Sequence, residues 1–274
     1  MPTGTAGNPT GGGAGRANGA AGSGLILPAA DGGGVSSDGD GGAVCARQQT
    51  EAALEPIYLA FAFDVSGSMG KGDKPWHDRS LKWEPVVRAT RGFLEDAASQ
   101  GLSASMTFFP ADGGDDTRCE LSSYQQADVT MRGLPSRDFG AALDVIGMED
   151  WRGGTPTLYV LQGIFAQIQA AEQTMPGRYA IVLVTDGYPQ DCDDDSIASV
   201  ATLVREHAST VPTYVIGVAN PPLDDAPDVT TNLAEVAAAG GTGDAHLIDT
   251  GDPDKTARDF TATIEAIRRA TVSC

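Results

Sequence analysis

Hydrophobic and polar positions alternate between two patterns along most of this chain. Continuous apolar runs are typical of buried parallel strands, whereas apolar positions that recur every three or four residues are typical of helices. The predicted strands are residues 57–63, 102–109, 179–187, 212–219 and 245–249, with a short edge strand around 127–131. The predicted helices are residues 84–101, 137–147, 155–173, 196–209, 230–241 and 256–270.

The regular alternation of strands and helices predicts the fold class. Parallel strands joined by helical crossovers form an open sheet that is covered on both faces. We therefore expect a three-layer, doubly wound α/β fold. Its sheet should be mostly parallel, with one short antiparallel edge strand.

The first 44 residues do not follow either pattern. They are rich in glycine and contain almost no apolar residues apart from LILP. Such a composition cannot bury enough surface to fold. We expect a flexible tether over residues 1–44, which resembles the start of an exported protein after removal of its signal, and one folded domain over residues 45–274.

The charge balance excludes two classes of partner. Eighteen basic residues against 37 acidic ones give a formal net charge of −19. Such a surface repels nucleic acid and anionic lipid and is compatible with cations. No apolar run approaches the roughly 18–20 residues that a membrane span requires, so we expect no transmembrane segment.

Oxygen-bearing side chains gather where predicted strands end. The stretch FAFDVSGSMG places Asp64, Ser66 and Ser68 directly after the first strand. Asp186 ends the apolar run in VLVTDG, and Thr155 in RGGTPT begins a helix. Ligands of open parallel sheets bind beyond the carboxyl ends of the strands, so we expect the five side chains to meet there. Their oxygens suit a hard divalent cation, Mg²⁺ first and Mn²⁺ or Ca²⁺ as alternatives, rather than zinc.

Each of these residues also has an ordinary structural explanation. Ser66 and Ser68 suit a strand-to-helix turn in which Ser68 is a cap, and Thr155 followed by Pro156 suits a helix N-terminus. Asp186 suits a turn. These alternatives stay open for each residue alone, but the occurrence of all of them in this order favours a metal site.

The same residues argue against three enzyme classes. A phosphatase of the haloacid-dehalogenase kind needs a second aspartate where this chain has Ser66. A serine hydrolase needs the elbow G-x-S-x-G and a histidine base, and Ser68 lacks the first glycine. The phosphate-binding motif G-x-x-x-x-G-K-[ST] is absent. We therefore expect no enzymatic activity, and surface or structural roles for His77, His207 and His246.

Three short motifs together carry a family resemblance. DVSGS, GGTPT and VTDG, in this order, resemble the metal-ion-dependent adhesion site of von Willebrand factor type A (vWA) domains. The resemblance runs from about Ile57 to Ile267 and implies a Rossmann-like vWA fold with one bound divalent cation. It implies direct binding of the cation by Ser66 and Ser68, and binding directly or through water by Asp64, Thr155 and Asp186.

The resemblance also implies a function. Proteins of this family bind other proteins, and an open coordination position accepts a carboxylate from the partner. We therefore expect a cation-dependent protein-binding or adhesion module whose partner supplies an Asp or Glu. The alternative is a structural component of an envelope complex, in which the ion only stabilises the loops.

The four cysteines allow three pairings. Cys45 precedes the first strand and Cys274 ends the last helix, so both belong opposite the site, whereas Cys119 and Cys192 lie in loops at the site. We expect the pairs Cys45–Cys274 and Cys119–Cys192. Disulfides indicate an extracytoplasmic, secreted or cell-surface protein. The glycine-rich tail resembles those of lipid-anchored surface proteins in the family, although no anchoring residue is in this sequence.

Two further features have open interpretations. The acidic loops favour solvated surface, with a second cation as the alternative; their residues are Asp115, Asp116, Asp193, Asp194 and Asp195. The segment 70–85 contains Trp76 and Trp83, which could contribute to partner recognition. Packing of both tryptophans against the fold is the favoured interpretation.

Overall fold

The structure is a computed structural model that describes residues 55–148 and 151–273. The predicted tether lies outside the described residues, so its flexibility stays a prediction. Within the described part of the chain, no helix combines the length and the apolar character needed to cross a membrane.

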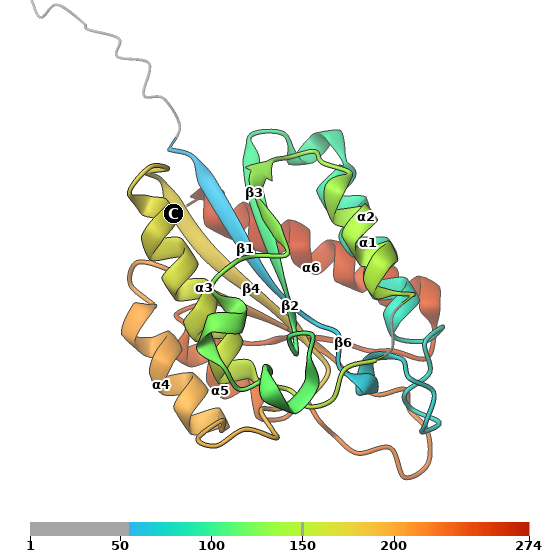
Figure 1. The fold of residues 1–274 in the computed structure, drawn as a ribbon. Coiled ribbons are helices and arrows are strands. Elements are labelled where there is room, and N and C mark those ends of the chain that lie inside the picture. Colours follow the sequence, from blue (N-terminus) through green and yellow to red (C-terminus); the bar gives the residue numbers. More distant parts are fainter. Residues whose placement is uncertain (1–54, 149–150, 274) are drawn as a thin grey trace, which may run out of the picture. The chain divides into compact units, whose positions relative to one another are not determined.

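Six strands form a single sheet in the order β3–β2–β1–β4–β5–β6 (Figure 1). The strands are β1 (Ile57–Asp64), β2 (Leu102–Phe109), β3 (Val129–Gly133), β4 (Arg178–Thr185), β5 (Thr213–Val218) and β6 (His246–Ile248). The pair of β2 and β3 is antiparallel, and the other neighbouring pairs are parallel. This is the predicted mostly parallel sheet with its antiparallel edge strand.

Helices cover both faces of the sheet and complete the three layers (Figure 1). One face is covered by α1 (Trp83–Glu95), α2 (Asp138–Ile146) and α6 (Pro253–Ser273). The other is covered by α3 (Thr157–Glu172), α4 (Ile197–His207) and α5 (Leu233–Ala239). The predicted three-layer, doubly wound α/β fold with a mostly parallel sheet is therefore confirmed.

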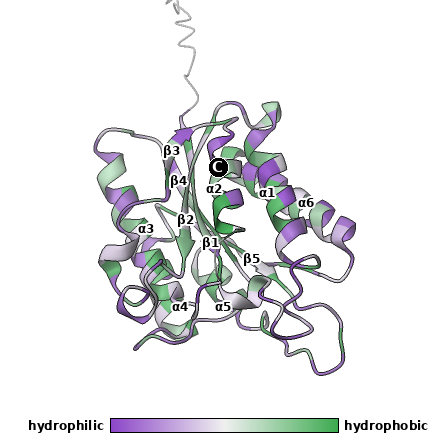
Figure 2. Cartoon of the chain, turned by 45° about the vertical axis from the view of Figure 1, so that its right-hand side comes forward, coloured by the Kyte–Doolittle hydropathy of each residue, from purple (hydrophilic) through white to green (hydrophobic). Residues whose placement is uncertain are grey.

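Strand β1 shows why the apolar runs are continuous. Phe61 and Phe63 pack into the core on one face, whereas Ala60 and Ala62 pack into the core on the other. A central strand with both faces covered needs apolar residues at every position. Figure 2 shows the result, since hydrophobic residues are concentrated in the sheet and hydrophilic residues on the helices around it.

The strand order places a crevice at one end of the sheet. From β1 the chain continues outward through β2 and β3, and from β4 it continues in the opposite direction through β5 and β6. The loops that follow β1 and β4 therefore separate at the point where the strand order reverses. This is the position at which open α/β sheets bind ligands.

Several element ends differ from those predicted. Helix α1 ends at Glu95 because Asp96 has extended backbone angles. The Asp96 carboxylate accepts a hydrogen bond from Ala98 N at 2.8 Å.

Trp83 is buried in the core, as the packing interpretation requires, whereas Trp76 is half-buried and contacts His77 edge-on.

Candidate metal site

Two carboxylates meet at the ends of adjacent strands. Phe63 and Val184 are paired in the parallel register, which brings Asp64 beside Thr185 and close to Asp186. Thr185 Oγ1 donates to Asp64 Oδ2 at 2.6 Å. Both carboxylates are buried, with 0% of Asp64 and 1% of Asp186 exposed. Burial of two neighbouring acids requires a compensating positive charge or proton.

The two serines connect these carboxylates. Ser66 N donates to Asp64 Oδ1 at 2.8 Å, and Ser68 Oγ donates to Asp186 Oδ1 at 2.7 Å. The two hydroxyl oxygens, Ser66 Oγ and Ser68 Oγ, are 3.0 Å apart. Neither hydroxyl caps the short 3-10 helix Gly67–Met69, so the capping interpretation is wrong for Ser68. Both hydroxyls point instead into the site.

Thr155 reaches the same region from a third loop. Its backbone pairs with Gln190 in both directions, through Thr155 N to Gln190 O at 3.3 Å and Gln190 N to Thr155 O at 3.2 Å. A Cβ added to Gly187 would lie 3.8 Å from Thr155 Oγ1, which places this hydroxyl beside the residue that follows Asp186. The loop between α2 and α3 also contacts the first loop, because Gly67 N donates to Arg152 O at 3.0 Å.

The structure gives Thr155 no capping role. Helix α3 begins at Thr157 after Pro156, two residues later than predicted. An oxygen from a different loop, Asp195 Oδ1, accepts the hydrogen bond from Leu158 N at 2.9 Å instead. The alternative in which Thr155 caps α3 is therefore wrong, and no cap of this helix uses the Thr155 hydroxyl.

A glycine and two tryptophans pack beside these loops. A Cβ on Gly70 would lie only 2.8 Å from the ring of Trp151, so no larger residue fits there. The ring of Trp151 meets that of Trp83 edge-on, with centroids 5.2 Å apart, and Trp83 meets Phe63 in the same way at 5.9 Å. The loop after β1 is thus held against the aromatic end of the core.

Lys82 is a site residue that the sequence interpretation missed. Its side chain is fully buried and forms an ion pair with Asp186 Oδ2. Its Nζ also donates to Ser68 O and to Asn220 Oδ1, both at 3.0 Å. The sequence did contain a signal, because Lys82 lies four residues before Val86 and continues the apolar face of the predicted helix. A lysine on a buried face needs a partner.

The surroundings of Asp64 disfavour its ionised form. Desolvation by burial, followed by the nearby charge of Asp186, raises the pKa of Asp64 to about 7. Hydrogen bonds from Thr185 and Ser66 act in the opposite direction and are outweighed. A divalent cation would remove this penalty by replacing the proton.

The donor set fits such a cation. Two carboxylates and three hydroxyls offer only oxygen, which Mg²⁺, Mn²⁺ and Ca²⁺ prefer. Ser68 is half-buried whereas the two aspartates are buried, so the site is approached from the side of Ser68. The arrangement can hold a hard cation at the sheet edge with a side open to a partner.

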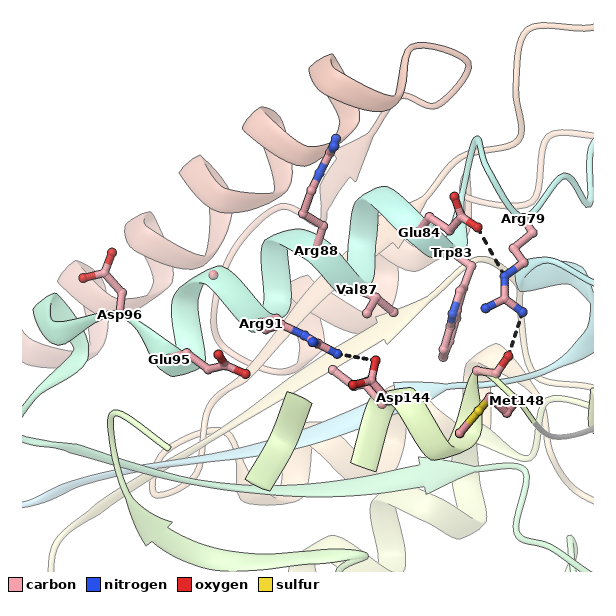
Figure 3. Close-up of a pocket in the computed structure, with 13 residues that line it drawn as sticks. Arg79, Trp83, Glu84, Val87, Arg88, Arg91, Glu95, Asp96, Asp144 and Met148 are labelled. Carbon is pink, nitrogen blue, oxygen red and sulfur yellow. Dashed lines mark hydrogen bonds and ion pairs between the residues drawn. The ribbon is translucent and has the colours of Figure 1, made fainter. Parts of the chain in front are cut away.

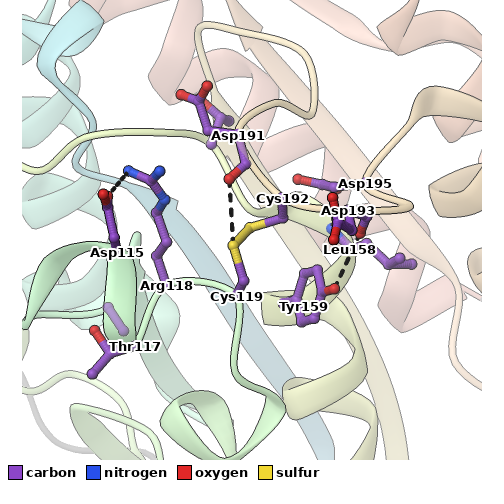
Figure 4. The surroundings of a disulfide bond; sticks show 12 residues. Asp115, Thr117, Arg118, Cys119, Leu158, Tyr159, Asp191, Cys192, Asp193 and Asp195 are labelled. Atoms are coloured by element: carbon purple, nitrogen blue, oxygen red, sulfur yellow. Dashed lines mark hydrogen bonds and ion pairs between the residues drawn. A yellow bond between two sulfur atoms is a disulfide. The ribbon is translucent and has the colours of Figure 1, made fainter.

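A disulfide joins two loops at this end of the sheet (Figure 4). Cys119 in the loop after β2 is bonded to Cys192 in the loop after β4, as the sequence predicts. Cys192 lies two residues after Gln190, whose backbone pairs with Thr155. The disulfide thus restrains the loop that positions Thr155. The second predicted pair, Cys45–Cys274, lies outside the described residues.

The acidic loops around the disulfide have other partners. Asp115 forms an ion pair with Arg118 at 2.7 Å, and the Asp193 carbonyl accepts a hydrogen bond from Tyr159 at 3.1 Å (Figure 4). Burial raises the pKa of Asp195, the residue that caps α3, to about 6. Among the described residues, no three His, Cys, Asp or Glu side chains are grouped to hold a metal ion. The second cation therefore has no support from the structure.

The three histidines lie elsewhere. His77 pairs with Asp73 at 2.6 Å, and the ring of His207 stacks on Phe165 with centroids 3.9 Å apart. His246 begins β6 at the edge of the sheet. None of them takes part in the hydrogen bonds that connect the strand ends described above.

A groove of about 740 Å³ between α1 and α2 is a separate feature (Figure 3). Its charged side chains are largely paired with each other: Arg79 with Glu84 at 3.4 Å, and Arg91 with Asp144 at 2.5 Å. A binding pocket usually contains a few polar groups that converge on a ligand. Because both pairs satisfy each other and no group of polar side chains among the described lining residues converges on one point, we assign no ligand to the groove.

Comparison with known proteins gives relatives in fold only. No protein-family model matches the sequence, and no curated protein matches it as a relative. The open conformation of the pilus adhesin SpaC from Lactobacillus rhamnosus GG superposes with a TM-score of 0.55 and 14% identity, over 80% of this chain and 30% of SpaC. A mutant of the PilB minor pilin from Streptococcus sanguinis gives a TM-score of 0.51 and 12% identity, over 81% of this chain and 63% of PilB.

One further structure superposes more loosely. The manganese-loaded TRAP protein from Plasmodium vivax gives a TM-score of 0.45 and 13% identity, over 76% of this chain and 74% of TRAP. The chain spans less than two thirds of both SpaC and PilB. At these identities the likeness to SpaC and PilB shows a shared fold alone.

Proposed function

We propose that this domain is a protein-binding or adhesion module that depends on a divalent cation, rather than an enzyme. The observation that carries the proposal is the convergence of Asp64, Ser66, Ser68 and Asp186 in one hydrogen-bonded cluster, with Thr155 beside it. The cluster lies at the end of the sheet where ligands bind. This convergence supports the proposal of a metal-ion-dependent adhesion site.

In this proposal the chain's own residues hold the ion and orient it. Ser66 and Ser68 supply hydroxyl oxygens, and the two aspartates and Thr155 bind directly or through water. When bound, the cation supplies an attractive site for an Asp or Glu carboxylate of a partner protein. The partner must otherwise overcome repulsion from a chain with a net charge of −19, so the contact depends on the cation.

We also propose that the protein acts outside the cytoplasm, in secreted form or at the cell surface. The disulfide between Cys119 and Cys192 supports an oxidising compartment. The fold relatives SpaC, a pilus adhesin, and PilB, a minor pilin, support a role in surface adhesion. Attachment to a lipid anchor is part of the same proposal, supported by the glycine-rich composition of residues 1–44.

Titration with Mn²⁺ by calorimetry tests the metal site. Ser66→Ala should weaken Mn²⁺ binding by at least about tenfold, because it removes a direct ligand from a small set. Ser122→Ala is the matched control, since Ser122 also lies in a short 3-10 helix but is exposed. Absence of Mn²⁺ binding by the unaltered protein would contradict the proposal.

Acetate tests the open coordination position. Bound Mn²⁺ is paramagnetic and shortens the relaxation times of nuclei in molecules that coordinate it. The Mn²⁺-loaded protein should therefore relax the acetate protons, and excess Mg²⁺ should abolish the effect. A purely structural ion predicts tight binding and a gain in thermal stability without relaxation of acetate, and this result would favour the envelope-component alternative.

A further inference from the structure

The buried ammonium group of Lys82 lies within a site that is expected to attract a cation. Its side chain and that of Asp186 are both 0% exposed, and the two form an ion pair. A buried charge is tolerated only where it is paired and hydrogen-bonded. Lys82 is therefore a fixed positive charge at the metal site rather than a mobile surface lysine.

Lys82 is held by the carboxyl ends of three strands. It contacts Asp186 after β4, the Ser68 carbonyl after β1, and Asn220 after β5. The Asn220 amide is oriented by its own bond from Nδ2 to Pro227 O at 2.8 Å, which leaves Oδ1 facing the lysine. Three acceptors for three N–H donors fully satisfy the ammonium group.

The two carboxylate oxygens of Asp186 thus have different partners. Oδ2 binds Lys82, whereas Oδ1 accepts from the Ser68 hydroxyl, which faces the proposed metal. The lysine therefore occupies a place beside the metal ligands and leaves the ligand oxygens of Ser66, Ser68 and Asp186 in position. Both positive charges can share this carboxylate.

The lysine changes the charge of the site in every state. Two ionised aspartates alone would carry −2, and a divalent cation would bring the total to zero. With Lys82 present and both aspartates ionised, the site carries −1 without the cation and +1 with it, and a partner carboxylate returns the total to zero. A net positive site attracts a carboxylate more strongly, whereas a less negative site attracts the cation less strongly.

We infer that Lys82 is a residue that sets the balance between metal affinity and carboxylate affinity at this site. It weakens binding of the divalent cation in the absence of a partner and strengthens binding of the partner's carboxylate once the cation is present. This inference rests on the proposed function.

Lys82→Met tests the inference because it removes the charge and keeps an unbranched side chain. At mildly alkaline pH, calorimetry with Mn²⁺ alone should give a dissociation constant at least about tenfold lower than that of the unaltered protein. Acetate relaxation on the Mn²⁺-loaded variant should show affinity for acetate that is several-fold weaker. Lys71→Met is the control, since Lys71 is exposed and close to the same loop through its contact with Gly67.

The two expected shifts have opposite signs, which a purely structural lysine would not produce. Weaker or unchanged Mn²⁺ binding by Lys82→Met, or stronger acetate binding, overturns the inference while leaving the metal site intact. If the unaltered protein binds no Mn²⁺, the proposed function fails and this inference fails with it. If Lys82→Met does not fold, Lys82→Gln decides by the same two measurements, because it keeps an N–H donor for Asp186 but carries no charge.

Discussion

At the scale of single residues, the site is defined by hydroxyl groups that the local backbone does not use. Ser66 and Ser68 begin a 3-10 helix, and Thr155 precedes α3, yet none of them caps these helices with its side chain. Caps would have satisfied the hydroxyls locally. The orientation of the two serines toward the carboxylates instead is what distinguishes a metal site from a set of ordinary turns.

The sequence allowed the ligands to be predicted but not their neighbours. Asp64 and Asp186 could be placed because each follows an apolar run, and parallel strands end at the same edge. The apolar face of the first helix could have marked Lys82 as a buried lysine, but its partner could not be identified, since Asp186 is 104 residues away and no spacing in the sequence connects the two. The hydrogen bond from Thr185 to Asp64 could not be predicted either, because the two residues are far apart in the sequence and Thr185 lies within a predicted strand.

The raised pKa of Asp64 predicts how metal binding depends on pH. Below pH about 7 the cation must displace a proton from this carboxyl, so the Mn²⁺ dissociation constant should rise about tenfold for each pH unit. Calorimetry between pH 5.5 and 8 measures this slope. A dissociation constant that stays constant across this range would contradict the assignment of Asp64 as a ligand that must be ionised.

The raised pKa of Asp64 also predicts how the stability of the protein depends on pH when no cation is present. Because the folded pKa lies above the unfolded value, the folded state holds the extra proton between pH about 4 and about 7. The contribution of Asp64 to the free energy of unfolding is therefore fully present at low pH and is lost as pH rises toward 7. Urea unfolding in EDTA should show that the free energy of unfolding falls as pH rises toward 7. The variant Asp64→Asn should not show this fall. Equal pH profiles of the two proteins would therefore contradict the prediction.

At the scale of elements, the predicted bounds of a strand or helix agreed with the structure where residues close in sequence determine its ends. β2 has the predicted bounds because Gly101 and Pro110 enclose its apolar run. The start of α3 was misplaced because its capping residue, Asp195, comes from a loop 37 residues further along the chain. Local signals determine a strand between two breakers, but a cap supplied by another loop cannot be read from the helix itself.

The disulfide predicts a combined loss of stability and affinity. Cys119 and Cys192 are separated by 73 residues, so the chain-entropy model gives about 4 kcal/mol of stabilisation for this loop. Replacing both cysteines by serine should lower the free energy of unfolding by an amount of this order. It should also weaken Mn²⁺ binding several-fold, because the loop that pairs with Thr155 is released.

Urea unfolding and Mn²⁺ titration measure the two effects. Treating the unaltered protein with a reductant should reproduce both, whereas the same treatment should not affect the double variant. Full stability of the double variant would show that packing alone holds the two loops.

At the scale of the whole molecule, the buried core stabilises the folded state, whereas the large net charge destabilises it. The sheet is central and both faces are covered, so the core could be predicted from alternating patterns alone. The charge of −19 follows from the composition, but its effect depends on where the acids lie. Among the described residues, many of them lie in exposed loops rather than in ion pairs.

This excess of charge predicts a stabilising effect of salt. Self-repulsion of a highly charged surface destabilises the compact state, and salt screens it. Raising NaCl from about 0.02 M to about 0.2 M in EDTA should increase Tm by about 2–4 °C, which corresponds to about 1 kcal/mol. Differential scanning calorimetry measures the shift. NaCl and KCl should act equally, and a fall in Tm would show that attractive ion pairs outweigh the repulsion.

The packing of Trp83 against Trp151 has an optical consequence. Trp83 follows Lys82 in the chain, and Trp151 covers Gly70 in the loop after β1. Indole emission responds to the polarity and motion of its surroundings, and paramagnetic Mn²⁺ quenches it at close range. Intrinsic fluorescence should therefore report, without any label, when this end of the sheet takes up an ion or meets a partner.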